Sequence, residues 1–157
     1  MKNNLRRLYA LVAILTLTIL GSAQENLGGG RLAGTWDVRV TIRNCQTGGE
    51  IMSFDSITQF MQGGMLLDST SSIPQSQKTP GQGIWRHVQG NTYRFTFKAF
   101  HFDAAGNYVE YRIVTHDAEM DPSGDSYSSA GTVRFFSPDG TLMRSGCSST
   151  TAKRLEF

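Results

Sequence analysis

The chain has 157 residues, of which 15 are basic, 13 are acidic and two are cysteines. This length corresponds to one domain. The formal net charge is only +2, so the chain lacks the basic surface that a nucleic-acid-binding domain requires.

The first 23 residues differ in character from the rest. Lys2, Arg6 and Arg7 precede an apolar run over residues 8–20, and the small residues Gly-Ser-Ala follow at 21–23. A basic start, a short apolar run and a small-residue exit are the three parts of a secretory signal peptide. The run is shorter than the roughly 20 residues that span a bilayer. We therefore expect export to the periplasm or the extracellular space, with cleavage after residue 23 and no membrane anchor afterwards.

Cleavage changes the charge balance and divides the chain. Three of the 15 basic residues and none of the 13 acidic ones lie before residue 24, which leaves 12 basic against 13 acidic residues, a net charge of −1. Residues 24–31 contain Gly28-Gly29-Gly30 and no apolar periodicity, as is typical of a flexible lead-in. We expect the signal peptide at 1–23, the lead-in at 24–31 and one domain at 32–157.

Both cysteines lie in the exported part. An even pair of cysteines in an oxidising compartment indicates a disulfide. We therefore predict a bond between Cys45 and Cys147.

The exported part has the pattern of an all-β protein. Apolar residues alternate with polar ones, most clearly over residues 34–43, and Gly, Pro, Asn and Asp cluster between the alternating segments. The predicted strands span residues 34–43, 54–61, 65–72, 83–88, 92–102, 108–120, 126–137 and 141–155. Eight strands joined mostly by short turns form an antiparallel meander that can close on itself. We expect an eight-stranded antiparallel up-and-down barrel.

Two independent features predict how the barrel closes. In a closed barrel the first and last strands are antiparallel partners, so the residue numbers of paired positions have a nearly constant sum. The disulfide between Cys45 and Cys147 gives 192, and pairing Trp36 with Arg154 gives 190. The disulfide would therefore place the Arg154 guanidinium beside the Trp36 indole, which is a favourable cation–π contact.

These residues also resemble a known family. Gly34-Thr35-Trp36 at the start of the first strand, together with Arg154 near the end of the last, resembles the Gly-x-Trp and terminal Arg signature of lipocalins and the wider calycin group. The resemblance implies that Trp36 closes one end of the barrel and that Arg154 packs over it. A barrel like that of allene-oxide cyclase or of dirigent proteins fits the strand count nearly as well.

The chain is also similar to a set of uncharacterised exported bacterial proteins. In those proteins a Gly-x-Trp start, a cysteine soon afterwards and a late Gly-Cys occur with a Lys-x-Phe-x-Phe-Asp-x-x-Gly-Asn stretch, which is Lys98 to Asn107 here. This second resemblance implies no activity.

The aromatic residues are the candidates for a binding site. Tyr93, Phe95 and Phe97 share one face of the fifth strand, and we expect Tyr111 and Ile113 of the sixth strand to line the interior with them. Phe100 and Phe102 have the opposite parity, which indicates a bulge or two partly covered faces. The predicted ligand-binding residues are Trp85, Tyr93, Phe95, Phe97 and Tyr111.

Catalytic chemistry has less support in the sequence. His116 is followed by Asp117 and Glu119, but residues an odd number of positions apart on a strand point to opposite faces. We therefore expect His116 to be a rim residue rather than a positioned base. The acidic residues around Asp121 lack the EF-hand spacing for calcium. We assign no catalytic residue, no metal ligand and no cofactor.

The sequence thus predicts an exported, non-enzymatic barrel that binds a small apolar or aromatic molecule entering at its open end. Two alternatives remain. One is a barrel enzyme of the cyclase or isomerase type, which a titratable residue buried at the cavity floor would favour. The other is an envelope or surface protein with a filled barrel.

Overall fold

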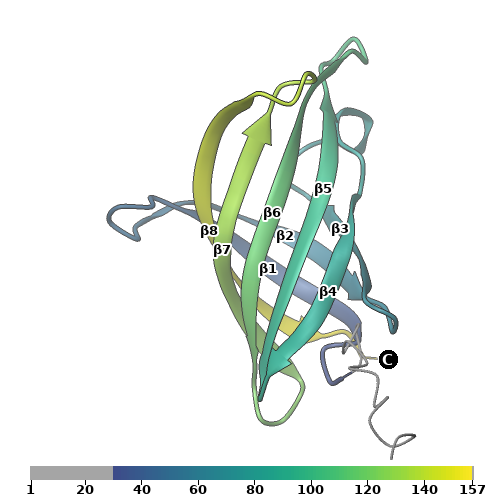
Figure 1. The fold of residues 1–157 in the computed structure, drawn as a ribbon, viewed down its shortest axis with the longest axis vertical. Coiled ribbons are helices and arrows are strands. Elements are labelled where there is room, and N and C mark those ends of the chain that lie inside the picture. The colour runs from purple at the N-terminus through teal and green to yellow at the C-terminus, as the bar shows by residue number, and fades with distance from the viewer. Residues whose placement is uncertain (1–29, 157) are drawn as a thin grey trace, which may run out of the picture.

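The computed structural model describes residues 30–156 as eight antiparallel strands closed into one barrel (Figure 1). Each strand pairs with its neighbours in the chain, and the last pairs with the first. This is the predicted up-and-down barrel. The predicted signal peptide and most of the lead-in lie outside the described residues.

The strand boundaries follow the alternating pattern closely. The strands are β1 (Gly34–Arg43), β2 (Glu50–Phe60), β3 (Met65–Thr70), β4 (Gly81–Gln89), β5 (Thr92–Phe102), β6 (Tyr108–Met120), β7 (Ser126–Phe136) and β8 (Leu142–Arg154). A short 3₁₀ helix, η1 (Gln75–Gln77), lies between β3 and β4. The bounds of β1, β5 and β6 are those predicted, whereas β2 begins four residues earlier than expected.

The seam between β1 and β8 has the predicted register. Trp36 is opposite Arg154, and Arg43 is opposite Cys147. Cys45, just beyond the end of β1, forms the predicted disulfide with Cys147. Such a bond is characteristic of proteins in oxidising compartments.

Arg154 seals one end of the barrel. Its guanidinium carbon lies 4.2 Å from the centroid of the Trp36 ring. The same guanidinium donates hydrogen bonds to the carbonyl oxygens of Ala33 at 2.9 Å and Gly124 at 2.8 Å. The Trp36 indole in turn donates to the Leu32 carbonyl at 3.0 Å. Because these contacts join the entry segment, the β6–β7 turn and the last strand, we call this the closed end.

Large apolar side chains fill the barrel next to the closed end. Phe60 is central, and its ring contacts Trp85, Phe95 and Tyr127 in edge-to-face geometry. The buried core consists of Leu32, Trp36, Val38, Phe60, Leu66, Trp85, Tyr93, Phe95, Phe97, Ala118, Met120, Tyr127 and Ala152, with Phe97 at its edge toward the other end of the barrel. Burying a large apolar side chain contributes roughly 1.5–3 kcal/mol, so this core is the main source of stability.

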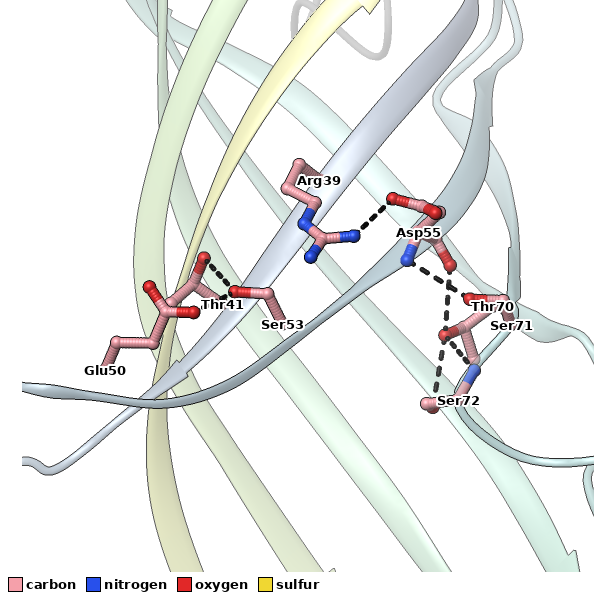
Figure 2. A network of polar contacts seen from close by, with 8 residues as sticks. All are labelled: Arg39, Thr41, Glu50, Ser53, Asp55, Thr70, Ser71 and Ser72. Carbon is pink, nitrogen blue, oxygen red and sulfur yellow. Dashed lines mark hydrogen bonds and ion pairs between the residues drawn. The ribbon is translucent and has the colours of Figure 1, made fainter.

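Polar contacts hold the outer face of β1 and β2, as Figure 2 shows. Arg39 pairs with Asp55 at 2.7 Å, and the Thr41 and Ser53 hydroxyls lie 3.1 Å apart. Arg39 and Asp55 are both exposed, and exposed ion pairs contribute little stability. The contacts therefore mark which face of these strands is in water.

A bulge lies at the turn end of the β5–β6 pair, but it comes after Phe100, so the parity of Phe100 reflects two partly covered faces of β5 rather than a bulge. Pairing with β6 shifts by one residue between His101 and Phe102. Before the bulge, Ala99 and His101 point inward and are buried, whereas Phe100 is on the outer face and 40% exposed. Within residues 30–156, no helix is both long enough and apolar enough to cross a membrane.

Candidate functional site

A cavity lies inside the barrel, between the packed closed end and the opposite end, which we call the open end. Its volume is about 70 Å³. It is lined by Val40, Ile42, Phe54, Ser56, Asp68, Thr70, Phe97, Arg112, Val114, His116, Val133, Phe135 and Ser148. Several lining residues nearest the open end are only half-buried, among them Ile42, Phe54 and Phe135. The cavity is therefore continuous with the open end of the barrel.

One wall of the cavity is apolar, and glycines let its aromatic ring lie flat on the sheet. Phe97 of β5 is 8% exposed. A Cβ at Gly81 would lie 2.5 Å from the Phe97 ring, and one at Gly83 would lie 2.6 Å from the Phe97 Cβ. Only glycine at these two positions of β4 leaves room for the ring. Val114 and Val133, which pair across β6 and β7, complete this wall.

Next to this wall, two residues along β6 from Val114, the cavity is lined by a buried histidine that is fully hydrogen-bonded. The Nδ1 atom of His116 lies 2.8 Å from the Ser129 hydroxyl, and its Nε2 atom lies 2.8 Å from the Ser148 hydroxyl. Ser129 also contacts the Thr150 hydroxyl at 2.6 Å. Burial lowers the pKa of His116 to about 4. The imidazole is therefore neutral at pH 7, with one nitrogen donating and the other accepting.

A carboxylate and a guanidinium also line the cavity without touching each other. Asp68 of β3 accepts hydrogen bonds from Ser56 at 2.6 Å and Thr58 at 3.2 Å. Arg112 of β6 forms no ion pair within 4 Å among the described residues, and its buried Nε atom has no hydrogen-bond partner. Burial lowers the pKa of Arg112, and the charges of Asp68 and Glu110 oppose that effect. A guanidinium nevertheless keeps its proton in proteins.

The β3–β4 loop adds a buried amine near the open end. Lys78 is 1% exposed and pairs with His101 of β5 through an isolated bridge. Its Nζ atom donates to the Thr79 carbonyl at 3.0 Å. Burial, and to a lesser degree the charge of Arg112, lowers the pKa of Lys78 to about 8. The amine is therefore still mostly protonated at pH 7.

His101 lies beside this amine and carries a second buried nitrogen without a partner. The residue is 7% exposed, and its Nε2 atom accepts or donates no hydrogen bond. Its Nδ1 atom is 3.6 Å from Glu110, which is too long for a hydrogen bond. Burial and the charge of Arg112 lower the pKa of His101 to about 4, so we treat this contact as neutral. Glu110 is instead held by Arg144 at 2.8 and 2.9 Å.

The predicted ligand-binding aromatics are not all found at the cavity. Phe97 lines it, as expected. Trp85, Tyr93 and Phe95 do point into the barrel, but they belong to the packed core at the closed end. The Trp85 indole is also occupied there, because it donates to the Met61 carbonyl at 2.9 Å. These three residues pack between the cavity and the closed end.

The placement of Tyr111 and Ile113 inside the barrel is wrong. Tyr111 is opposite Phe100 and stacks on Phe136, with ring centroids 4.9 Å apart. The Lys98 amine lies 3.8 Å from the centroid of the Tyr111 ring. Facing residues of paired strands share a face, so Tyr111 is on the outer face with the exposed Phe100. Ile113, two positions along, shares that face.

The expectation that His116 is a rim residue is also wrong, because its side chain is 2% exposed and lies inside. Sequence reasoning further missed Asp68, Arg112 and Lys78. Asp68 has the same parity as the buried Leu66, and Arg112 has that of Val114 and His116, so strand periodicity held a signal for both. Lys78 is in a loop, where periodicity gives none.

A second hollow, of about 690 Å³, lies on the outer face of the barrel. Its polar lining includes Asp37, Arg39, Asp55, Glu119 and Lys153. This hollow is broad and open, and its Arg39 and Asp55 already pair with each other. The interior cavity instead has a lining residue, Arg112, with a buried polar atom that lacks a partner, so we place the candidate site inside the barrel.

Comparison with known proteins adds little to this picture. No protein-family model matches the chain, and no curated protein matches it. Among solved structures, Rv2717c from M. tuberculosis is similar over 81% of this chain and 94% of its own length, with 11% sequence identity and a TM-score of 0.39.

Proposed function

We propose that this domain is an exported, lipocalin-like barrel that binds a small molecule in its interior cavity without transforming it. The observation that carries the proposal is the composition of that cavity. The cavity combines an apolar wall around Phe97 with polar side chains, and one lining residue, Arg112, has a buried Nε atom without a hydrogen-bond partner. Binding sites for small molecules combine an apolar lining with a few such polar groups.

The volume of the cavity limits the size of the ligand. A cavity of about 70 Å³ is far smaller than the roughly 300–1,000 Å³ that encloses a drug-sized molecule. Because the closed end is filled by core residues, a ligand enters only as far as Phe97. The proposed ligand is therefore compact, or it is one end of a longer molecule whose remainder lies toward the open end.

The enzymatic alternative depends on the two titratable groups at the cavity, His116 and Asp68. Both nitrogens of His116 are hydrogen-bonded to serine hydroxyls, and Asp68 accepts from Ser56 and Thr58. A catalytic base needs a free atom within reach of the substrate proton. The bonds to both nitrogens favour a supporting role for His116, whereas both bonds to Asp68 use the same oxygen, Oδ2. We rank binding above catalysis because the histidine, which is the usual general base near neutral pH, has no free atom.

The test is an NMR titration of the ¹⁵N-labelled domain with two neutral probes of different size, 1-butanol and benzyl alcohol. We expect saturable shifts of amides beside the cavity, including those of Phe97, Val114 and Val133. Val114→Phe would fill the cavity and raise the dissociation constant at least about tenfold, which corresponds to about 1.4 kcal/mol.

The matched control is Ile113→Phe, which adds the same ring to the outer face of the same strand. We expect it to leave the dissociation constant unchanged within about twofold, or about 0.4 kcal/mol. Shifts confined to the outer face, or an equal loss in the two variants, would argue against interior binding and favour the filled-barrel alternative.

Export is the second part of the proposal. It is supported by the Cys45–Cys147 disulfide, because such bonds persist mainly outside the reducing cytosol. The signal-like pattern of residues 1–23 points the same way.

A further inference from the structure

The charges inside the barrel near its open end do not balance. Lys78 is a buried cation there and Arg112, which lines the cavity, is half-buried, whereas Asp68 is the buried anion near them. Glu110 does not offset the difference, because it is engaged by both terminal nitrogens of Arg144. One positive charge is therefore left without a counter-charge. Buried charges are normally paired, since leaving water is costly for an ion.

Hydrogen bonding in the same region is also incomplete. The Arg112 Nε–H group has no acceptor, and the Nε2 atom of His101 has no partner. These two residues are neighbours on paired strands, since Arg112 is opposite Ala99 and Glu110 is opposite His101. Buried polar groups nearly always find partners. The Arg112 Nε–H group is always a donor, so it lacks an acceptor, whereas the His101 Nε2 atom donates or accepts according to its tautomer.

The carboxylate that lines the same cavity as Arg112 does not supply this acceptor. Asp68 lines the same cavity as Arg112, but its carboxylate is directed to Ser56 and Thr58 on β2. No Asp or Glu of the described residues lies within 4 Å of the Arg112 guanidinium. The acceptor that fits the gap must therefore come from outside the barrel residues.

We propose that the cavity recognises the carboxylate of a compact organic acid, with the Arg112 guanidinium as its main donor. This inference rests on the proposed binding function and names the chemical class of the ligand. The carboxylate would supply the missing negative charge and accept from Arg112 in the forked geometry typical of such pairs. The apolar body of the acid would lie against Phe97, Val114 and Val133, which line the same cavity.

Lys78 and His101 complete the anion site from the side of the open end. Their backbones pair through an isolated bridge, and both residues are buried beside the cavity, although neither lines it. The Lys78 amine has only the Thr79 carbonyl as partner, so two of its three hydrogens remain for an anion. Lys78 is thus a positioning and charge-supplying residue, whereas Arg112 makes the direct contact.

The experiment compares acids with alcohols of the same shape. Butyrate is paired with 1-butanol and benzoate with benzyl alcohol, and acetate tests the head group alone. Binding to the intact domain is followed by NMR, including the side-chain Nε–H signal of Arg112. We expect each acid to bind at least about tenfold more tightly than its alcohol, a difference of about 1.4 kcal/mol, and to shift the Arg112 signal.

Two variants with the same change of side chain separate the site from general charge effects. Arg112→Met should reduce the acid-to-alcohol ratio to within about twofold, or about 0.4 kcal/mol, while alcohol binding is retained. Arg134→Met removes an arginine from the exposed face of the adjacent strand, next to Phe135, and should leave the ratio unchanged. Arg112→Lys, which keeps the charge but loses the fork, should give an intermediate ratio.

Each outcome has a distinct meaning. Equal binding of acids and alcohols to the wild type, or acid binding without a shift of the Arg112 Nε–H signal, overturns the carboxylate site but leaves the proposed binding function standing. Failure of both acids and alcohols to bind removes both proposals. Binding of acetate as tight as that of butyrate and benzoate means that the site takes a free small anion, which overturns the proposed role of the apolar wall.

Discussion

Single residues determine the protonation inside this barrel. His116 is held by two serine hydroxyls and is only 2% exposed, and burial lowers its pKa from an ordinary 6.5 to about 4. A histidine at the rim would have kept water as its partner. The polar side chains that surround it therefore act as substitutes for solvent around a neutral ring.

This burial makes the stability of the domain depend on pH. Between pH 6.5 and pH 4 the unfolded chain binds a proton at His116 that the folded chain does not. Stability is therefore complete above about pH 6.5 and declines as the pH falls toward 4. The difference in pKa corresponds to about 3 kcal/mol. We expect urea unfolding at pH 7 and pH 4.5 to show a loss of this order.

His116→Gln should remove about half of the pH dependence that the two buried histidines cause. Part will persist, because burial and Arg112 lower the pKa of His101 in the same sense. The control is His87→Gln, since the His87 ring contacts the Gly90 carbonyl in an exposed turn. A His116→Gln profile as steep as that of the wild type would contradict this account.

At the scale of elements, one bulge explains why strand positions were predicted better than strand faces. Most β5–β6 pairs have residue numbers that sum to 211, but the pair next to the turn, Phe102 and Tyr108, sums to 210. A hairpin extended from the turn without a bulge would place Tyr111 opposite Ala99, inside the barrel. The bulge moves β6 by one residue and so exchanges its faces.

The polarity of the residues could not correct the inward placement of Tyr111. Near the open end, the usual rule that apolar residues face inward and polar residues face outward is reversed. There β6 turns Arg112 inward and Tyr111 outward. Nearer the closed end the same strand follows the ordinary rule, with Met120 buried and Glu119 exposed. Counting back from the buried Met120 in steps of two along β6 gives the residues that face inward, and Arg112 is one of them.

Close packing between β6 and β7 gives a prediction at this scale. A Cβ at Gly131 would collide with the Thr115 carbonyl oxygen and would lie 2.8 Å from the His116 Cα. Both are backbone atoms that cannot move aside alone. We expect Gly131→Ala to cost about 1–3 kcal/mol of unfolding free energy, measured by urea unfolding.

Gly146→Ala in the neighbouring strand β8 is the matched control. Its nearest contact would be a Val133 methyl group at 3.3 Å, and a side chain can adjust. We expect a change within about 0.5 kcal/mol, with a gain possible because alanine restricts the unfolded chain. Equal losses in the two variants would show that the close approach at Gly131 does not matter.

For the whole molecule, the topology could be predicted from the turn residues and from the pairing of the first strand with the last. The turn residues separated the strands, and the Trp36–Arg154 and Cys45–Cys147 pairs fixed how the first strand meets the last. The filling of the interior could not be predicted in the same way. Whether a barrel is packed or hollow depends on the volumes of side chains from all eight strands together, and here it is packed at one end and polar at the other.

The disulfide is the contact with the greatest consequence at this scale. It joins residues 102 positions apart, so it closes most of the domain into one loop. A loop of about 100 residues gains at most ~4.7 kcal/mol from the restricted unfolded chain. Domains of this size are stable by only about 5–15 kcal/mol, so the bond supplies a large share and holds the seam between β1 and β8.

We therefore expect Cys147→Ser to lower the melting temperature by at least about 5 °C, because about 1 kcal/mol shifts a domain of this size by roughly 3–6 °C. Cys45→Ser and the double variant should have the same effect as the single one, since each removes the same bond. Reductant should reproduce the loss in the wild type and add nothing in the variants.

Intact mass and unreduced peptide mapping of protein from its native compartment test the proposed export and the disulfide together. We expect a chain that begins at Gln24 and a Cys45–Cys147 peptide, whereas free thiols or retention of residues 8–20 would contradict the proposed export.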